Sequence, residues 1–193
     1  MRVLESGKLT AINKKTGMGK MGWRGFTLVE LLVVLAVGAI LLTIAIPGYA
    51  FLVNGSRLTA VTNDLVTALH LARSEAIKRG MRITLCKSNS TSSSFPSCNS
   101  SAEWQQGWLI FVDGGTRGVV DAGDILLRTQ HPVSTAIITT SNNFSSFISY
   151  LPNGVSQGGN WLGNGKVHIC VAGNQRDIII NLTGRPRLNS SSC

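Results

Sequence analysis

The amino-acid sequence predicts an α+β fold in which one long amino-terminal α-helix, whose first half can span a membrane, packs on an antiparallel β-sheet domain. Three observations predict this fold: an apolar stretch from Phe26 to Ile46, an apolar spacing of three and four residues after it, and short β-rich segments after Gly80. A chain of 193 residues has room for one globular domain and one specialised segment of this kind.

The stretch from Phe26 to Ile46 is long enough to cross a bilayer, since about 20 helical residues span roughly 30 Å. Basic residues precede it and almost no charge follows until Arg57, so the amino terminus is expected in the cytoplasm and the rest outside. A signal peptide would have a shorter apolar run with small residues at its end. A plain membrane anchor fits the length, but it does not explain Glu30, because an unpaired carboxylate within lipid is costly.

The helix is expected to resume beyond Pro47 and to lie on the globular domain. Its apolar and small side chains recur on one narrow face, namely Leu58, Val61, Thr62, Leu65, Leu69, Ala72 and Ala76. Gly80 closes this pattern as a helix C-cap would, with Lys78 and Arg79 in the last turn.

Seven β-rich segments follow, separated by clusters of Gly, Asn and Ser, and we expect one antiparallel sheet or a pair of small sheets. The segments are residues 82–87, 108–113, 125–129, 135–140, 147–150, 167–171 and 177–181.

All four cysteines follow the apolar stretch and so would lie in an oxidising compartment, where disulfides persist. Four cysteines allow three pairings, of which we favour Cys86 with Cys98 and Cys170 with Cys193. The first pair brackets the Ser-rich residues 88–101, which we interpret as a disulfide-clipped loop between strands.

The segment Gly25-Phe26-Thr27-Leu28-Val29-Glu30 resembles the processing site of type IV prepilins and type II secretion pseudopilins. The resemblance implies that a prepilin peptidase cuts after Gly25 and methylates the new amino terminus at Phe26. It also implies that Glu30 neutralises the Phe26 ammonium of a neighbouring subunit inside the apolar filament core, where an unpaired charge would be costly.

This resemblance divides the chain into a leader (residues 1–25), a membrane and filament-core half-helix (26–53) and a periplasmic or extracellular domain (54–193). The protein would cross the inner membrane once and then join other pilins in a pilus or pseudopilus. Met18 or Met21 would give the short leaders usual for this family, so the start codon stays open. The whole chain has a net charge of +9, and the six basic residues and one acidic residue before Phe26 contribute +5 of it. Removing the leader therefore leaves a net charge of +4.

The domain has no recognisable catalytic or metal site, and we expect neither an enzyme nor a cofactor. The three histidines are scattered without motif spacing, and the sequence shows no pairing of a nucleophilic side chain with a general base. The acids between Asp113 and Asp124 suggest calcium, but their spacing fits turns better. Trp104, Trp108, Trp161 and His168 suggest a base-stacking platform, but we favour core or partly covered surface for them.

The carboxy-terminal segment Gly184-Arg185-Pro186-Arg187 is a candidate grip on a phosphate backbone. Gly184 and Pro186 are expected to break the preceding strand and to leave Arg185 extended. In an extended chain, Arg185 and Arg187 would project to one side, roughly 6 to 7 Å apart. Guanidinium groups bind phosphate oxygens bidentately, and such contacts carry no sequence specificity. A solvated tail is the alternative.

Three segments together resemble the GspH/FimT family of minor pilins and pseudopilins: Ala72-Arg73-Ser74-Glu75-Ala76, the strand Gly107-Trp108 to Asp113, and Gly184-Arg185-Pro186-Arg187. The resemblance implies a pilin fold and, as in FimT-like members, DNA binding by the tail during natural transformation. Lys166 and Arg176 would extend the basic patch, and a Cys170–Cys193 bridge would fasten the tail. The alternative is a structural minor pilin, or a type II secretion pseudopilin, that primes or caps a filament without binding DNA.

Overall fold

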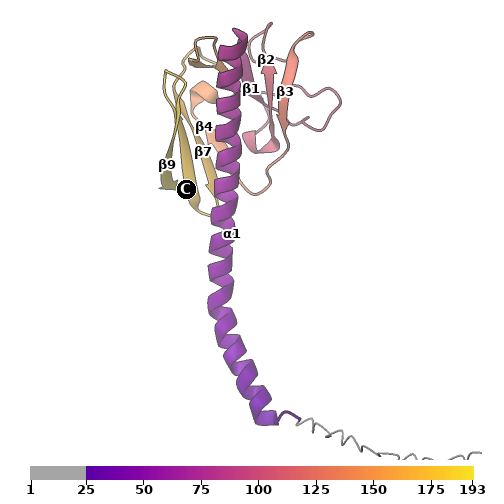
Figure 1. The fold of residues 1–193 in the computed structure, drawn as a ribbon, viewed down its shortest axis with the longest axis vertical. Helices are drawn as coiled ribbons and strands as arrows, with labels where there is room; N and C mark the ends of the chain where they lie inside the picture. Colours follow the sequence, from indigo (N-terminus) through magenta and orange to yellow (C-terminus); the bar gives the residue numbers. More distant parts are fainter. Residues whose placement is uncertain (1–24) are drawn as a thin grey trace, which may run out of the picture. The chain divides into compact units, whose positions relative to one another are not determined.

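The structure is a computed structural model that describes residues 25–193, so the predicted leader lies outside the described residues except for Gly25. The chain divides into two units, Met1–Ile44 and Ala45–Cys193. One helix, α1 (Leu28–Arg79), contains residues of both units and has Pro47 in its interior (Figure 1).

In the first unit, the described part of α1 is apolar apart from Glu30 and Thr43, and none of its residues is buried. The helix α1 as a whole contains an 18-residue window with a mean hydropathy of 2.8, so it is long and apolar enough to cross a membrane by length and composition. Side chains such as Leu35 and Leu41 are more than half exposed. An apolar surface of this size indicates burial in lipid or against protein partners.

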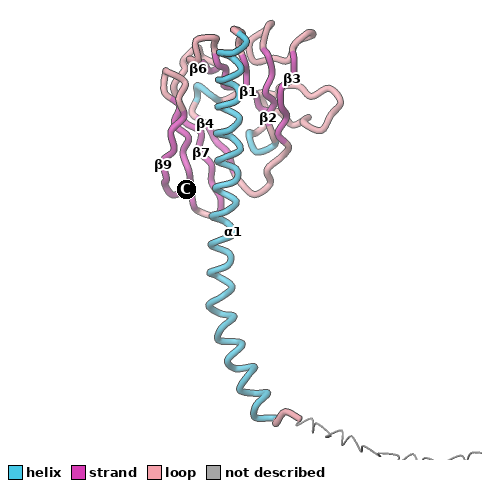
Figure 2. The backbone as a smooth tube through the Cα atoms, viewed as in Figure 1, coloured by secondary structure: helices cyan, strands magenta, loops and turns pink. Residues whose placement is uncertain are grey.

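The second unit contains nine strands in two antiparallel sheets. In Figure 2, β1, β2 and β3 lie on one side of the carboxy-terminal half of α1, and β4, β7 and β9 lie on the other. The five-stranded sheet has the order β3-β2-β1-β5-β6 and the four-stranded sheet the order β4-β7-β8-β9. The strands are β1 (Ile83–Lys87), β2 (Trp108–Val112), β3 (Ile125–Gln130), β4 (Ile137–Thr140), β5 (Phe147–Tyr150), β6 (Ser156–Gly158), β7 (Gly165–Val171), β8 (Asn174–Ile180) and β9 (Pro186–Ser192). Two short 3-10 helices, η1 (Trp104–Gln106) and η2 (Asn142–Phe144), lie between strands.

One core joins α1 to both sheets. The predicted face of α1, from Leu58 to Ala76, is buried together with side chains of the five-stranded sheet, such as Ile110, and of the four-stranded sheet, such as Ile169. Gly80 ends the helix in the left-handed conformation at φ +64°, which favours glycine. The fold class, the buried face and the paired-sheet arrangement are therefore confirmed.

A smaller cluster covers the other face of the five-stranded sheet. Cys86, Leu109 and Phe111 are buried there, with Cys98 and Phe147 packed against them. The disulfide between Cys86 and Cys98 clips the Ser-rich loop onto this face. This arrangement explains why β1 and β2 are buried throughout rather than in alternation.

Candidate nucleic-acid interface on the four-stranded sheet

The predicted strand break is present, since β8 ends at Ile180 and Gly184 lies in the turn that follows, but the residues from Pro186 onward form an edge strand, β9, that was not predicted. β9 pairs with β8 along its whole length, from Ile180 opposite Pro186 to Asn174 opposite Ser192. Pro186 is the first residue of an edge strand, where a missing backbone donor is tolerated. The carboxy-terminal residues therefore form one edge of the four-stranded sheet.

Gly184 makes the tight turn between β8 and β9. Its N–H donates to the carbonyl of Asn181 at 2.9 Å, and its φ is +73°. Gly184 is buried, and a Cβ added there would lie 2.3 Å from the Gly154 carbonyl oxygen and 2.9 Å from Tyr150 Cε1. We interpret Gly184 as the residue that fixes the position of the arginines rather than as a ligand contact.

Arg187 and Lys166 share the outer face of the four-stranded sheet. Ile178 and Ile180 are buried in the core, so Ile179 between them faces outward. Directly paired residues of antiparallel strands lie on the same face, and Ile179 pairs with Lys166 on one side and Arg187 on the other. Strands lie about 4.8 Å apart, so the backbones of the two cations are about 10 Å apart, and both residues are exposed.

Arg185 stands two residues before Arg187, in the turn that leads into β9. The N–H of Arg185 donates to the side-chain oxygen of Asn181 at 3.0 Å, and its carbonyl accepts from the Asn181 N–H at 3.5 Å. Arg185 is exposed. Asn181 thus holds the backbone of Arg185 while the guanidinium remains accessible.

Arg176 does not join this patch, contrary to the prediction. It pairs with Ile169 on β7 and Ser190 on β9, a row on the opposite face from Lys166 and Arg187. There it lines an open pocket with Phe51 of α1. The strand alternation separates Arg176 from the tail arginines.

Among the described residues, Asp177 is the one carboxylate on the outer face of the four-stranded sheet. It is almost fully buried and is hydrogen-bonded. Its Oδ1 is 2.8 Å from Nδ1 of His168 and accepts from Gln175 Nε2 at 2.6 Å. Burial alone would raise the pKa of Asp177, but hydrogen bonds from His168 and Gln175 and the nearby charges of His168 and Lys166 lower it overall. The exposed charges at this corner are therefore positive.

A disulfide between Cys170 and Cys193 fastens the far end of β9 to β7 across β8. Both favoured cysteine pairings are present in the structure. The edge strand is consequently held at its turn by Gly184 and at its end by a covalent bond.

The acids between Asp113 and Asp124 stabilise their own loop. The buried Asp113 accepts from Arg82 Nη2 at 2.6 Å, from the Thr84 hydroxyl at 2.6 Å and from the Gly118 N–H at 2.9 Å. Asp124 accepts from the backbone of Gly114 at 3.0 Å. These donors account for the acids as loop caps, and no group of three metal-ligating side chains occurs among residues 25–193.

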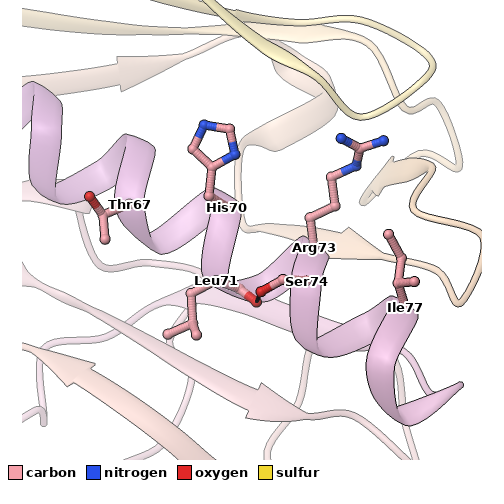
Figure 3. Close-up of a pocket in the computed structure, with 6 residues that line it drawn as sticks. All are labelled: Thr67, His70, Leu71, Arg73, Ser74 and Ile77. Atoms are coloured by element: carbon pink, nitrogen blue, oxygen red, sulfur yellow. Dashed lines mark hydrogen bonds between the residues drawn. The ribbon is translucent and has the colours of Figure 1, made fainter.

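An open pocket of about 470 Å³ lies on the exposed flank of α1 (Figure 3). In Figure 3, the side chains of His70 and Arg73 extend from the same side of the helix. Arg73 Nε donates to the Gly154 carbonyl at 3.0 Å, and Gly184 packs on that carbonyl. Arg73 thus connects α1 to the turn that carries the arginines, a contact that the helical spacing alone did not reveal.

At the other end of the described chain, Gly25 and Phe26 precede α1 and are exposed. The hydroxyl oxygen of Thr27 accepts from the Glu30 N–H at 3.2 Å, so Thr27 caps the helix. The Thr-x-x-Glu spacing was the available signal for this cap. Glu30 lies in the first turn, where the helix dipole favours a negative charge.

Comparisons with known protein families and structures define the class of the protein. The sequence profile of the type II transport protein GspH matches residues 61–184, well over half of the chain, and the prokaryotic N-terminal methylation motif matches residues 24–46. The chain therefore belongs to the GspH family, which consists of pilin-like structural proteins.

Two crystal structures of the type IV minor pilin FimU from Pseudomonas aeruginosa (strain PAO1) have a similar fold. They align with a TM-score of 0.51 each and with 20% and 19% sequence identity. The alignments cover 70% and 72% of this chain and 97% and 93% of the FimU chains. At this level of sequence identity, the similarity to FimU establishes the pilin fold alone. A search of curated proteins finds no match.

Proposed function

We propose that this protein is a minor type IV pilin that binds DNA without sequence preference through its carboxy-terminal edge strand, for DNA uptake in natural transformation. The observation that carries the proposal is the corner formed by Arg185, Arg187 and Lys166. Arg187 lies on an edge strand that is fixed at both ends, Arg185 lies in the turn before it, and Lys166 lies on the same face two strands away. All three are exposed, whereas the carboxylate on this face is buried and paired.

The chemistry of this corner suits a phosphate backbone. Two guanidinium groups can each donate a bidentate pair of hydrogen bonds to phosphate oxygens, and the Lys166 ammonium adds a third positive charge. A rigid strand holds them before binding, so little conformational freedom is lost on contact. Few phosphates are neutralised, and we therefore expect weak affinity that falls as salt rises.

The amino-terminal residues deliver the domain to its place of action. Prepilin peptidase cuts between Gly25 and Phe26, and the helix that follows holds the protein in the inner membrane with the domain in the periplasm. The two disulfides are in keeping with that oxidising compartment. Glu30 then pairs with the amino terminus of a neighbouring pilin as the subunit enters the filament.

A second candidate function is a structural minor pilin or pseudopilin that primes or caps a filament. The family description, type II transport protein, is the observation that favours it. In this case Arg185 and Arg187 would be solvated surface residues with no effect on DNA.

The affinity for a fluorescent DNA duplex distinguishes the two functions. The titration uses the chain from Phe26 onward, which lacks the basic leader, in neutral detergent. Arg185→Gln with Arg187→Gln should weaken binding at least about tenfold, since each lost hydrogen bond to a charged group contributes on the order of 1.5 kcal/mol or more. Arg176→Gln, which removes a charge from the opposite face, is the matched control and should have a much smaller effect. Equal affinity of wild type and the double variant would support the structural function instead.

A further inference from the structure

Trp161 differs from the other described tryptophans because its side chain is at the surface. It is 71% exposed, whereas Trp104 and Trp108 are 3% and 2% exposed. Its φ is +69°, a conformation that a bulky side chain rarely adopts. Such strain persists where the surroundings enforce it, and it concentrates at functional positions.

The loop around Trp161 is held by several hydrogen bonds. The Trp161 N–H donates to the Gly158 carbonyl at 3.2 Å, and the Leu162 carbonyl accepts from the Gly158 N–H at 2.8 Å. The Asn160 side chain donates to that of Asn143 at 2.6 Å. These bonds fix a loop that holds a large apolar ring out of the core.

A cation covers one face of the indole. Arg117 Cζ lies 3.5 Å from the centroid of the Trp161 ring and 5.5 Å from that of Phe147. Arg117 Nη2 also donates to the Gly159 carbonyl at 3.1 Å, so the guanidinium is held from two sides. With one face stacked on Arg117 and the side chain 71% exposed, the other face of the indole is open for a flat ligand.

The Trp161 loop and the arginine turn meet at Ser156. The Ser156 hydroxyl is 2.5 Å from the Gly163 carbonyl and 3.2 Å from the Asn181 carbonyl. Gly163 is two residues from Trp161, and Asn181 holds the backbone of Arg185. The open ring and the cations therefore lie at the same end of the domain.

We propose that Trp161 is a stacking platform for an unpaired nucleobase of a single strand whose phosphates lie on Arg185, Arg187 and Lys166. This inference rests on the proposed function, because it adds a base contact to the phosphate contacts. Aromatic rings beside a basic surface bind single strands without sequence preference, since every base has a π-face. In a duplex the bases are paired and stacked, so Trp161 makes the site prefer a single strand.

The test compares a fluorescent 12-nucleotide oligothymidine with an abasic strand of the same length and charge, bound to the chain from Phe26 onward in neutral detergent. Wild type should bind oligothymidine about 5- to 150-fold more tightly than the abasic strand. Trp161→Ala should remove this preference and leave the affinity for the abasic strand unchanged, which also shows that the variant is folded. Trp161→Phe should retain part of the preference, because it keeps a ring.

Each other outcome decides against a specific claim. If wild type binds both strands equally, or if Trp161→Ala weakens both equally, the stacking inference is overturned while binding by the tail arginines stands. If wild type binds neither strand nor a duplex, the proposed function fails as well.

Discussion

Replacing Gly184 by alanine tests how the β8–β9 turn positions the arginines. At φ +73°, an alanine costs about 1 to 2 kcal/mol from backbone strain alone. The new Cβ would also lie 2.3 Å from the Gly154 carbonyl oxygen, a backbone atom that cannot move without shifting its turn. Forced overpacking typically costs a further 1 to 3 kcal/mol, so we expect Gly184→Ala to lower the free energy of unfolding by about 2 to 5 kcal/mol.

Gly173 in the β7–β8 turn provides a matched control. Its φ is +85°, but a Cβ added there meets no atom within 4 Å. Gly173→Ala should therefore show the strain alone, about 1 to 2 kcal/mol. Guanidinium unfolding followed by tryptophan fluorescence measures both variants, and equal losses would refute the packing role of Gly184.

Three further predictions concern other parts of the chain. Replacing Cys170 and Cys193 by serine should lower the free energy of unfolding by about 3 kcal/mol and should speed amide hydrogen exchange in β9. Unchanged exchange rates would show that the disulfide does not hold the edge strand. The Glu30→Ala variant should still be cleaved before Phe26 but should be incorporated poorly into filaments. Immunoblots of sheared filaments measure the incorporation, and a normal amount of the variant would contradict the assembly role of Glu30. Because the folded pKa of Asp177 is lowered, its carboxylate contributes stability at neutral pH that is lost as the pH falls below about 4 through the folded value. Asp177→Asn should therefore reduce the acid sensitivity of unfolding, and an unchanged pH profile would contradict that contribution.

Much of the fold could be predicted because the chain has strong local patterns. The three- and four-residue spacing identified the buried face of α1, and all seven predicted strands are present. β6 was not predicted, since Ser156–Gly158 has no apolar periodicity and pairs only because β5 lies beside it. β9 was not predicted either, because Gly184 and Pro186 are ordinary signals of a strand end and its polar residues carry no core pattern.

The candidate site was only partly readable from the sequence. The Arg185–Arg187 pair was visible as a motif, but whether Lys166 or Arg176 lies beside it depends on register and strand parity across β7, β8 and β9. The sequence also grouped Trp161 with Trp104, although their exposures are opposite. Those distinctions come from long-range pairing, which no local pattern encodes.

The salt dependence of DNA binding tests the central claim most directly. Each phosphate neutralised on a duplex contributes about 0.9 to the slope of the logarithm of the association constant against the logarithm of salt concentration. If Arg185 and Arg187 each contact one phosphate, the double glutamine variant should have a slope shallower than wild type by about 1.8. Identical slopes for the two proteins would contradict a phosphate grip by the carboxy-terminal edge strand.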